Sequence, residues 1–186
     1  TLLYAGTLAP WQGIGDLMLA LRRCARSHDF RFVVAGSARR RWRKQLRRRA
    51  RRGGVLEALD FMGPLTREEL AIEVAKADIC LAPLRADIRN RNQGCSPIKL
   101  FEYMSAGRAV LSTDLPCVTE ILENGETGML VRPSRPKALS EGIVELLDSE
   151  DQRSSLGRAA RERILANGTW THRREQLRSF YRRLTS

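Results

Sequence analysis

The strongest constraint on the fold is the alternation of short apolar segments, rich in strand-forming residues, with longer segments of helical periodicity. The predicted strands are Leu2–Leu8, Phe30–Ala35, Leu59–Met62, Ile79–Leu84, Ala109–Ser112 and Met129–Val131. The predicted helices are Ile14–Ser27, Ala38–Arg51, Arg67–Lys76, Pro97–Ser105, Val118–Leu122, Lys137–Asp148, Asp151–Asn167 and Thr171–Leu184. Strands joined by helices pair in parallel through right-handed crossovers, with helices on both faces. The sequence therefore predicts an α/β fold, a doubly wound, Rossmann-like sheet of six parallel strands with additional C-terminal helices.

The length of 186 residues suits a single domain, which we place at residues 1–186 with a terminal packing helix at 169–186. No apolar run approaches the roughly 20 residues that span a bilayer, so we expect a soluble globular domain. The chain starts at Thr1, without a methionine, and continues directly into an apolar segment. We therefore expect it to be one half of a larger protein.

The positive charge is concentrated in one segment. The chain has 33 basic and 21 acidic residues, a net charge of +12, and ten of the basic residues lie within Arg39–Arg52. Without these ten, 23 basic residues remain, a net charge of only +2. Three interpretations stay open for this segment: a solvated helix face, contact with an anionic membrane surface, and nucleic-acid binding. The last is disfavoured because Trp42 is its only aromatic residue, so stacking platforms are missing.

Cysteine and histidine usage argues against a metal site. Cys24, Cys80, Cys95 and Cys117 lie far apart, and only two histidines could join them as ligands. The wide spacing and the large predicted core also argue against a disulfide-stapled secreted protein. We therefore expect a cytoplasmic protein that holds no metal or other cofactor.

Ligands of doubly wound sheets bind at the carboxyl ends of the strands, so the loops there are the place to look for a site. The longest of them is Arg85–Ser96, and the helix that follows it is the most informative segment of the chain. Ser96 is a suitable N-cap and Pro97 suits the first helical position. The unpaired amides and positive dipole of such a helix start favour an anion such as phosphate.

Two charged side chains extend this pattern. Lys99 adds a mobile positive charge in the first turn, and Glu102 lies three residues later on roughly the same face, ~9 Å along the axis from Ser96. This spacing suits a diphosphate at the helix tip and a ribose diol bound to the carboxylate. The alternative is that Lys99 and Glu102 form an exposed ion pair with a purely structural role.

Several segments together resemble one known family. They are Tyr4–Gly13, Phe32–Gly36, Phe61–Leu65, Ser96–Gly107, Glu120–Leu122 and Asn124–Val131, in this order. The chain resembles the carboxy-terminal, nucleotide-sugar-binding half of retaining GT-B glycosyltransferases of the glycosyl transferases group 1 family. The resemblance implies a nucleoside-diphosphate sugar as the donor, an acceptor bound by an amino-terminal domain across a cleft, and no metal.

The resemblance also implies roles for individual residues. Glu102 corresponds to the second Glu of the family's Glu, seven residues, Glu pattern, which holds the ribose hydroxyls. The first Glu, which contacts the donor sugar, falls at Gly94 and is missing. The Arg and Lys that meet the diphosphate in the first loop fall at Thr7 and Gln12.

With these charges absent, Lys99 and the amides of Cys95, Ser96 and Ile98 would make most of the contacts to the diphosphate. Pro97 cannot contribute because it has no N–H. As a further hypothesis, Thr7 and Gln12 replace the two missing charges, while Arg89 or Arg91 on the long loop reaches inward to stabilise the leaving group.

The remaining candidates surround this site. Gly63, Pro64 and Leu65 lie where the family reads the base, although a tight turn explains them equally well. Cys95 is interpreted as a small filler. Trp11 either lines the first loop or packs at the domain edge, and the edge is favoured. Three aromatic residues of the last helix are assigned to packing, namely Trp170, Phe180 and Tyr181.

Two functions follow. The first is a hexosyltransferase-like enzyme that transfers a sugar, with retention, to a hydroxyl of a sugar or lipid-linked acceptor, in the cytoplasm or at the inner membrane surface. Its catalytic residues are unassigned, and the isolated domain is expected to be inactive. The second is a degenerate nucleotide-binding module without turnover.

Overall fold

A six-stranded, all-parallel sheet forms the centre of the molecule in the computed structural model, which describes residues 1–93 and 95–185. The strands are β1 (Leu2–Ala5), β2 (Phe32–Ala35), β3 (Leu59–Gly63), β4 (Ile79–Ala82), β5 (Ala109–Thr113) and β6 (Met129–Val131). They lie in the order β3-β2-β1-β4-β5-β6, so the chain moves outward from β1 in one direction and then returns to continue on its other side. The predicted doubly wound α/β fold is confirmed.

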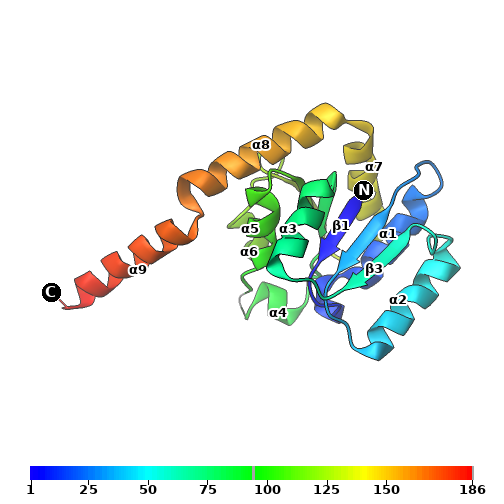
Figure 1. The fold of residues 1–186 in the computed structure, drawn as a ribbon, viewed down its shortest axis with the longest axis horizontal. Helices are drawn as coiled ribbons and strands as arrows, with labels where there is room; N and C mark the ends of the chain where they lie inside the picture. Colours follow the sequence, from blue (N-terminus) through cyan, green and yellow to red (C-terminus); the bar gives the residue numbers. More distant parts are fainter. Residues whose placement is uncertain (94, 186) are drawn as a thin grey trace.

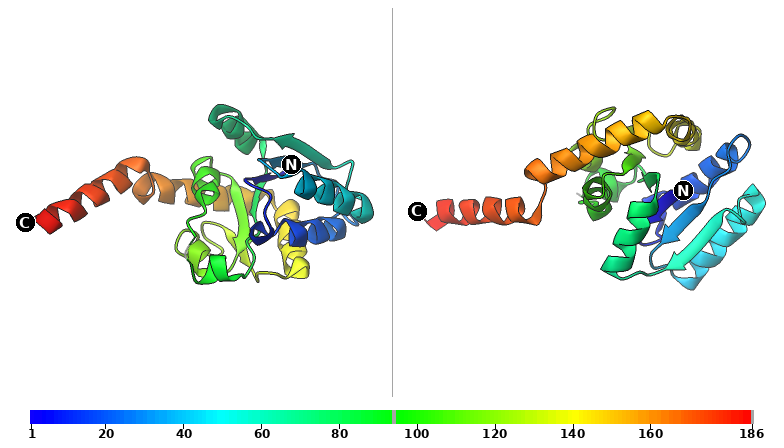
Figure 2. Two further views of the ribbon diagram at one scale, coloured as in Figure 1. Left: turned by 90° about the horizontal axis from the view of Figure 1, so that it is seen from below. Right: turned by 45° about the horizontal axis from the view of Figure 1, so that its top comes forward.

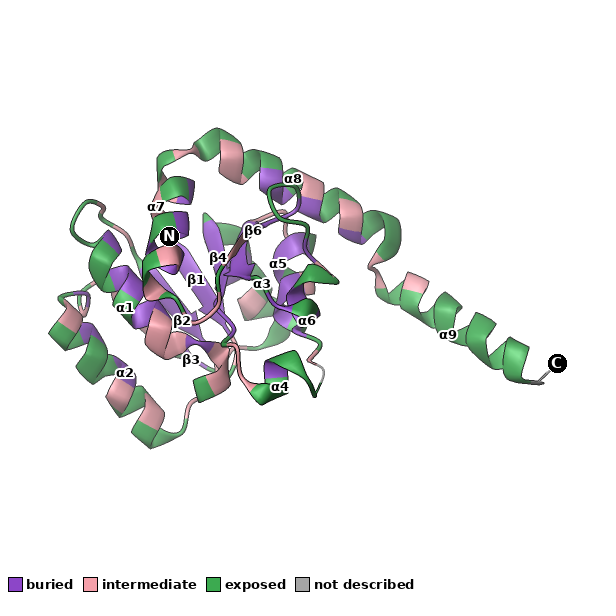
Figure 3. Ribbon diagram, turned by 180° about the vertical axis from the view of Figure 1, so that it is seen from behind, coloured by how far each residue is buried: buried purple, intermediate pink, exposed green. Residues whose placement is uncertain are grey.

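The central strands of the sheet are buried on both faces. Leu2 pairs with Phe32 and Ile79, which places β1 between β2 and β4 at the centre of the sheet. Every residue of β1, β2, β4 and β5 is buried, as expected for parallel strands covered by helices on both sides. Purple strands enclosed by partly green helices make this visible in Figure 3.

The helices form a layer on each face of the sheet (Figure 1). One apolar cluster joins alternate strand residues such as Leu2 and Tyr4 to α1 (Ile14–Cys24), α2 (Arg40–Gly53) and α7 (Pro136–Asp148). The other joins residues such as Leu3 and Ala5 to α3 (Arg67–Lys76), α5 (Ile98–Ser105), α6 (Pro116–Thr119) and α8 (Glu150–Asn167). The period of two along each strand therefore divides the core into two layers.

Local capping explains why α3 has the predicted bounds. Thr66 Oγ1 accepts a hydrogen bond from Glu69 N at 3.2 Å, and Glu69 Oε2 accepts one from Thr66 N at 2.8 Å. This capping box satisfies two backbone donors that would otherwise lack partners at the helix start. Two short elements were not predicted: the 3-10 helix η1 (Pro10–Gln12) and α4 (Ile88–Arg91).

The last helix, α9 (Trp170–Thr185), projects away from the body of the domain (Figures 1 and 2). Trp170 is 77% exposed, Phe180 49% and Tyr181 59%. These three side chains, which the sequence assigned to packing, are therefore largely exposed in the described part of the chain, and the packing role of residues 169–186 stays a prediction. Neither apolar cluster of the described residues includes them. None of the helices in the described part of the chain has the length and apolarity needed to cross a bilayer.

Candidate functional site

Glycine turns shape the carboxyl edge of the sheet, where a site was expected. Gly6 and Gly36, which follow β1 and β2, have φ values of +131° and +149°. A Cβ on Gly36 would lie 2.1 Å from the Gly6 carbonyl oxygen. The loop after β2 can approach the loop after β1 this closely only because Gly36 carries no side chain.

The start of α5 differs from the prediction by one residue. Pro97, with ψ of 85°, is the N-cap, and the helix begins at Ile98. Ser96 is exposed and its side chain caps nothing, so its assignment as N-cap was wrong. Leu100 N bonds to the Pro97 carbonyl. Among the residues that the structure describes, the amides of Cys95, Ser96 and Ile98 donate no hydrogen bond.

Lys99 is buried, with 9% of its surface exposed. Its Nζ donates a hydrogen bond of 2.7 Å to Gln12 Oε1 and lies 4.2 Å from the centre of the Tyr4 ring. Burial lowers the pKa of Lys99 to about 7, and the neighbouring Cys95 and Glu102 counteract part of this shift. The expectation of a mobile charge at the helix tip was wrong, because this ammonium is fixed beneath the first loop.

The same network includes Thr7 and Gln12, the two first-loop positions at which the resemblance leads one to expect cations. The Tyr4 hydroxyl is 2.9 Å from the Thr7 carbonyl oxygen and 3.4 Å from Gln12 Oε1. Thr7 is exposed, whereas Gln12 is half-buried and its side-chain oxygen accepts the hydrogen bond from Lys99. The structure thus brings Thr7, Gln12 and Lys99 together on one side of the sheet edge.

Glu102 lies on the wall of a cleft of about 970 Å³ between α3, α5 and the junction of α8 with α9. Leu65, Ser96 and Ile98 line the same cleft, whereas Gly63 and Pro64 do not. The Glu102 side chain is exposed, and no ion pair with Lys99 is formed among the described residues. The structural alternative of an exposed Lys99–Glu102 pair is therefore excluded, and the carboxylate faces the cleft.

Sequence reasoning missed the role of α4. Asn90, only 1% exposed, donates from Nδ2 to the carbonyl oxygens of Trp11 at 2.9 Å and Arg85 at 2.8 Å. The guanidinium of Arg89 lies 4.8 Å from the centre of the Trp11 ring. Arg89 is thus held against Trp11, and Arg91 is exposed, so neither is seen to point inward. Asp87, which caps the Asn90 amide, was the signal in the sequence for this short helix.

Cys95 packs against the apolar cluster that also holds Cys117. Burial raises the pKa of the Cys117 thiol to about 11, and the adjacent Cys95 thiol contributes to this shift. The contacts agree with the interpretation of Cys95 as a small filler.

Gly94, the expected donor-sugar position, lies outside the described residues. Within the described ranges there is no group of three or more His, Cys, Asp or Glu residues that could hold a metal ion.

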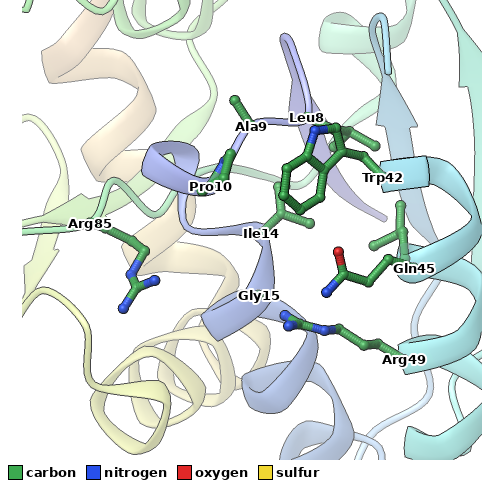
Figure 4. A pocket seen from close by; sticks show the side chains of 10 residues that line it. Leu8, Ala9, Pro10, Ile14, Gly15, Trp42, Gln45, Arg49 and Arg85 are labelled. Carbon is green, nitrogen blue, oxygen red and sulfur yellow. The ribbon is translucent and has the colours of Figure 1, made fainter. Parts of the chain in front are cut away.

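A second, smaller pocket of about 130 Å³ lies between the first loop and α2 (Figure 4). Trp42, Gln45 and Arg49 reach into it from α2 and face Pro10 and Ile14. None of the predicted diphosphate ligands lines this pocket.

Comparison with known proteins decides the family. The family model for glycosyl transferases group 1 matches residues 1–149. The chain belongs to the glycosyl transferases group 1 family. A glycogen synthase of Mycobacterium tuberculosis is 28% identical over 173 residues, 91% of this chain and 39% of that protein. A phosphatidyl-myo-inositol mannosyltransferase of Mycobacterium leprae is 33% identical over 131 residues, 70% of this chain and 31% of that protein.

Solved structures of this family's fold agree. Sucrose-phosphate synthase of Thermosynechococcus elongatus superimposes with a TM-score of 0.87 at 22% identity, covering 99% of this chain and 45% of that one. Anabaena HepE in complex with UDP and glucose gives a TM-score of 0.83 at 18% identity, over 96% of this chain and 47% of that one. The chain thus has the fold of one half of a GT-B glycosyltransferase and spans about half the length of these proteins.

Proposed function

We propose that this chain is the donor-binding half of a glycosyltransferase that moves a sugar from a nucleoside diphosphate to an acceptor hydroxyl, with retention at the anomeric carbon. The observation that carries the proposal is the position of the Glu102 carboxylate in the large cleft, beside Ser96 and Ile98 at the start of α5. Glu102 lies four residues beyond Ile98, about 6 Å along the helix axis. A pyrophosphate at the helix start thus leaves the adjoining ribose beside the carboxylate.

The residues divide the work by their chemistry. The amides of Cys95, Ser96 and Ile98 offer hydrogen bonds to the diphosphate, and the dipole of α5 favours its negative charge, which grows as the sugar leaves. Lys99 contributes positive charge from beneath the first loop, where its Nζ is hydrogen-bonded to Gln12 Oε1. The Thr7 hydroxyl, exposed above this network, is a further donor. Glu102 accepts hydrogen bonds from the ribose diol, and Leu65 packs against the base.

A second candidate function is nucleotide binding without turnover. It is favoured by Thr7 and Gln12, which supply no cation where the family usually has two, and by Gly94, which lacks a carboxylate for the donor sugar. Binding of the diphosphate and turnover of the donor distinguish the two functions.

The whole-protein activity requires a second domain that binds the acceptor, so we propose that residues 1–186 alone bind nucleotide and transfer nothing. The donor is a hexose or a similar sugar, and the acceptor is a sugar or a lipid-linked hydroxyl. We place the reaction in the cytoplasm, at the inner surface of a membrane when the acceptor is a lipid.

Glu102→Gln in the full-length protein tests the proposal, with Glu68→Gln as the matched control on the exposed surface of α3. Calorimetric titration with UDP, GDP and ADP measures binding, and release of the diphosphate from the matching nucleotide sugar measures turnover. Loss of charged hydrogen bonds to the ribose weakens binding about 10- to 100-fold in Glu102→Gln, while Glu68→Gln binds like the wild type. Equal affinities in the two variants would contradict this site, and binding without turnover would favour the second function.

A further inference from the structure

We propose that the outward face of α2 docks the protein onto an anionic lipid surface. The proposal rests on the proposed function and deepens it by naming the surface on which the transferase meets its acceptor.

The geometry of α2 separates its residues into two faces. Leu46 and Ala50 are buried against the sheet and Trp42 is half-buried beside them. At 3.6 residues per turn, the outward half of the helix carries only basic residues, all of them exposed. This basic stripe consists of Arg40, Arg41, Lys44, Arg47, Arg48, Arg51 and Arg52.

The basic stripe has no acidic partner among the described residues. Elsewhere in the structure exposed arginines do pair with carboxylates, as Arg85 does with Asp16 at 3.4 Å. Ion pairs of the described chain involve no residue of α2. Like charges three and four residues apart repel each other and destabilise a helix. Folding alone therefore does not account for the stripe, whereas a negatively charged partner does.

The chemistry of the stripe favours a lipid surface over a nucleic acid. The two nearby aromatic rings are already covered, because the guanidinium of Arg41 lies 5.0 Å from the centre of the Trp42 ring and that of Arg43 lies 5.7 Å from that of Phe61. Base stacking needs an open aromatic face. A straight stripe of about 20 Å, by contrast, matches a flat layer of anionic headgroups.

The binding expected is electrostatic and superficial. No large hydrophobic side chain of α2 is exposed, so nothing on this helix would insert among acyl chains. Each basic residue near an anionic leaflet adds to the attraction, which falls off within a Debye length. The interaction should therefore disappear at high salt.

The amino end of α2 lies close to the candidate donor site. The helix follows the carboxyl end of β2, so its amino end lies at the sheet edge that carries the candidate site. Trp42 of α2 and Pro10 of the first loop line one pocket, which places the two segments side by side (Figure 4). A protein held by the basic stripe keeps its donor site next to the surface in which a lipid-linked acceptor is anchored.

The test compares two fourfold variants of the full-length protein that change net charge equally. The stripe variant replaces four residues of the basic stripe by Gln: Arg40, Lys44, Arg47 and Arg51. The control variant replaces four exposed arginines outside α2 by Gln: Arg23, Arg26, Arg158 and Arg174. Sedimentation measures binding to vesicles of phosphatidylcholine with phosphatidylglycerol, and to phosphatidylcholine alone, at about 0.1 M and about 1 M salt.

The wild type and the control variant are expected to sediment with the anionic vesicles at the lower salt only. The stripe variant binds them at least about tenfold more weakly. Equal binding by the two variants, equal binding to neutral vesicles, or a preference for an added DNA duplex over the vesicles would overturn the proposal.

Two further measurements keep the result interpretable. The melting temperature of the stripe variant stays the same or rises, because repulsion is relieved, so weaker binding is not a sign of unfolding. Nucleotide titration without vesicles reports the donor site separately. Normal nucleotide binding with no vesicle binding by the wild type refutes docking alone, whereas vesicle binding without nucleotide binding refutes the proposed function alone.

Discussion

Lys99 Nζ is 2.7 Å from Gln12 Oε1, which joins the first turn of α5 to the loop after β1, two segments separated by 87 positions in the chain. The contact occurs in an environment so well shielded from water that the pKa of Lys99 falls to about 7. A lysine of ordinary pKa would be fully charged at neutral pH. The protonation of Lys99 can therefore change when a diphosphate binds nearby. Its titration has two measurable consequences.

The first consequence is the pH dependence of stability. Burial holds the pKa of Lys99 near 7 in the folded state, whereas the unfolded chain keeps a value near 10.5. Between these values the unfolded state binds more protons, so the free energy of unfolding rises with pH, by at most about 1.4 kcal/mol per unit. The penalty for burying the charge is fully present below pH 7 and is relieved above it. Urea denaturation at pH 7 and 9 should show this rise in the wild type.

Lys99→Met is the comparison for that measurement. Met has a similar length and no charge, so the variant lacks the contribution of Lys99 to the rise. Tyr4, Cys24 and Cys117, whose pKa values are raised by burial, are present in both proteins and cancel in the comparison. Parallel pH dependences in wild type and variant would show that Lys99 titrates normally.

The second consequence is proton uptake when nucleotide binds. At pH 8 most Lys99 side chains are neutral in the free protein, because the pKa is about 7. A diphosphate nearby favours the charged form and raises that pKa. Titration of UDP, or whichever of UDP, GDP and ADP binds, in two buffers of different ionisation enthalpy should reveal uptake of up to one proton. Lys99→Met should show almost none, and uptake equal to that of the wild type in this variant would refute the link.

Local signals in the sequence were sufficient for the sheet and for most helices. The bounds of α3 agree with the prediction, and its start is fixed locally because Thr66 and Glu69, three residues apart, cap the helix. The start of α5 was predicted one residue too early, since the sequence does not fix the ψ angle of Pro97. A proline at the N-cap and one at the first helical position look the same in the sequence.

The candidate site was predicted in its residues but not in its arrangement. Glu102 and Ser96 were expected at one cleft and the structure places both there. Lys99 was expected in solvent, because nothing near it in the sequence reveals that Tyr4 and Gln12 cover it. For the same reason, the sequence did not reveal that α9 projects away from the body of the domain (Figure 1). An apolar stripe shows which face of a helix seeks cover, but not which surface supplies it.

Tyr103→Phe tests the support beneath the site. The Tyr103 hydroxyl is fully buried and accepts a hydrogen bond of 2.7 Å from Ala5 N, at the end of β1. Removal of the oxygen leaves that buried N–H without its partner and should lower the free energy of unfolding by about 1–3 kcal/mol. Ser105→Ala, which removes an exposed hydroxyl from the same helix, should change it by less than about 0.5 kcal/mol. Equal effects in a urea titration would show that the Tyr103 bond adds nothing.

Gly13→Ala should be the most damaging of these substitutions, because two effects combine at this residue. Gly13 has a φ of +73°, and a Cβ there would lie 1.6 Å from the carbonyl oxygen of Pro83, at the end of β4. Gly54 is the matched control, since its φ is +70° and nothing lies within 4 Å of its added Cβ.

Backbone strain alone should cost Gly54→Ala about 1–2 kcal/mol of unfolding free energy. Gly13→Ala suffers the same strain and must also move the first loop away from β4, so its loss should be at least about 2 kcal/mol larger. The displaced loop carries Gln12, the partner of Lys99, so nucleotide affinity should fall in Gly13→Ala and remain normal in Gly54→Ala. Urea denaturation and nucleotide titration of both variants decide this, and equal losses of stability would mean that the contact with Pro83 is relieved without cost.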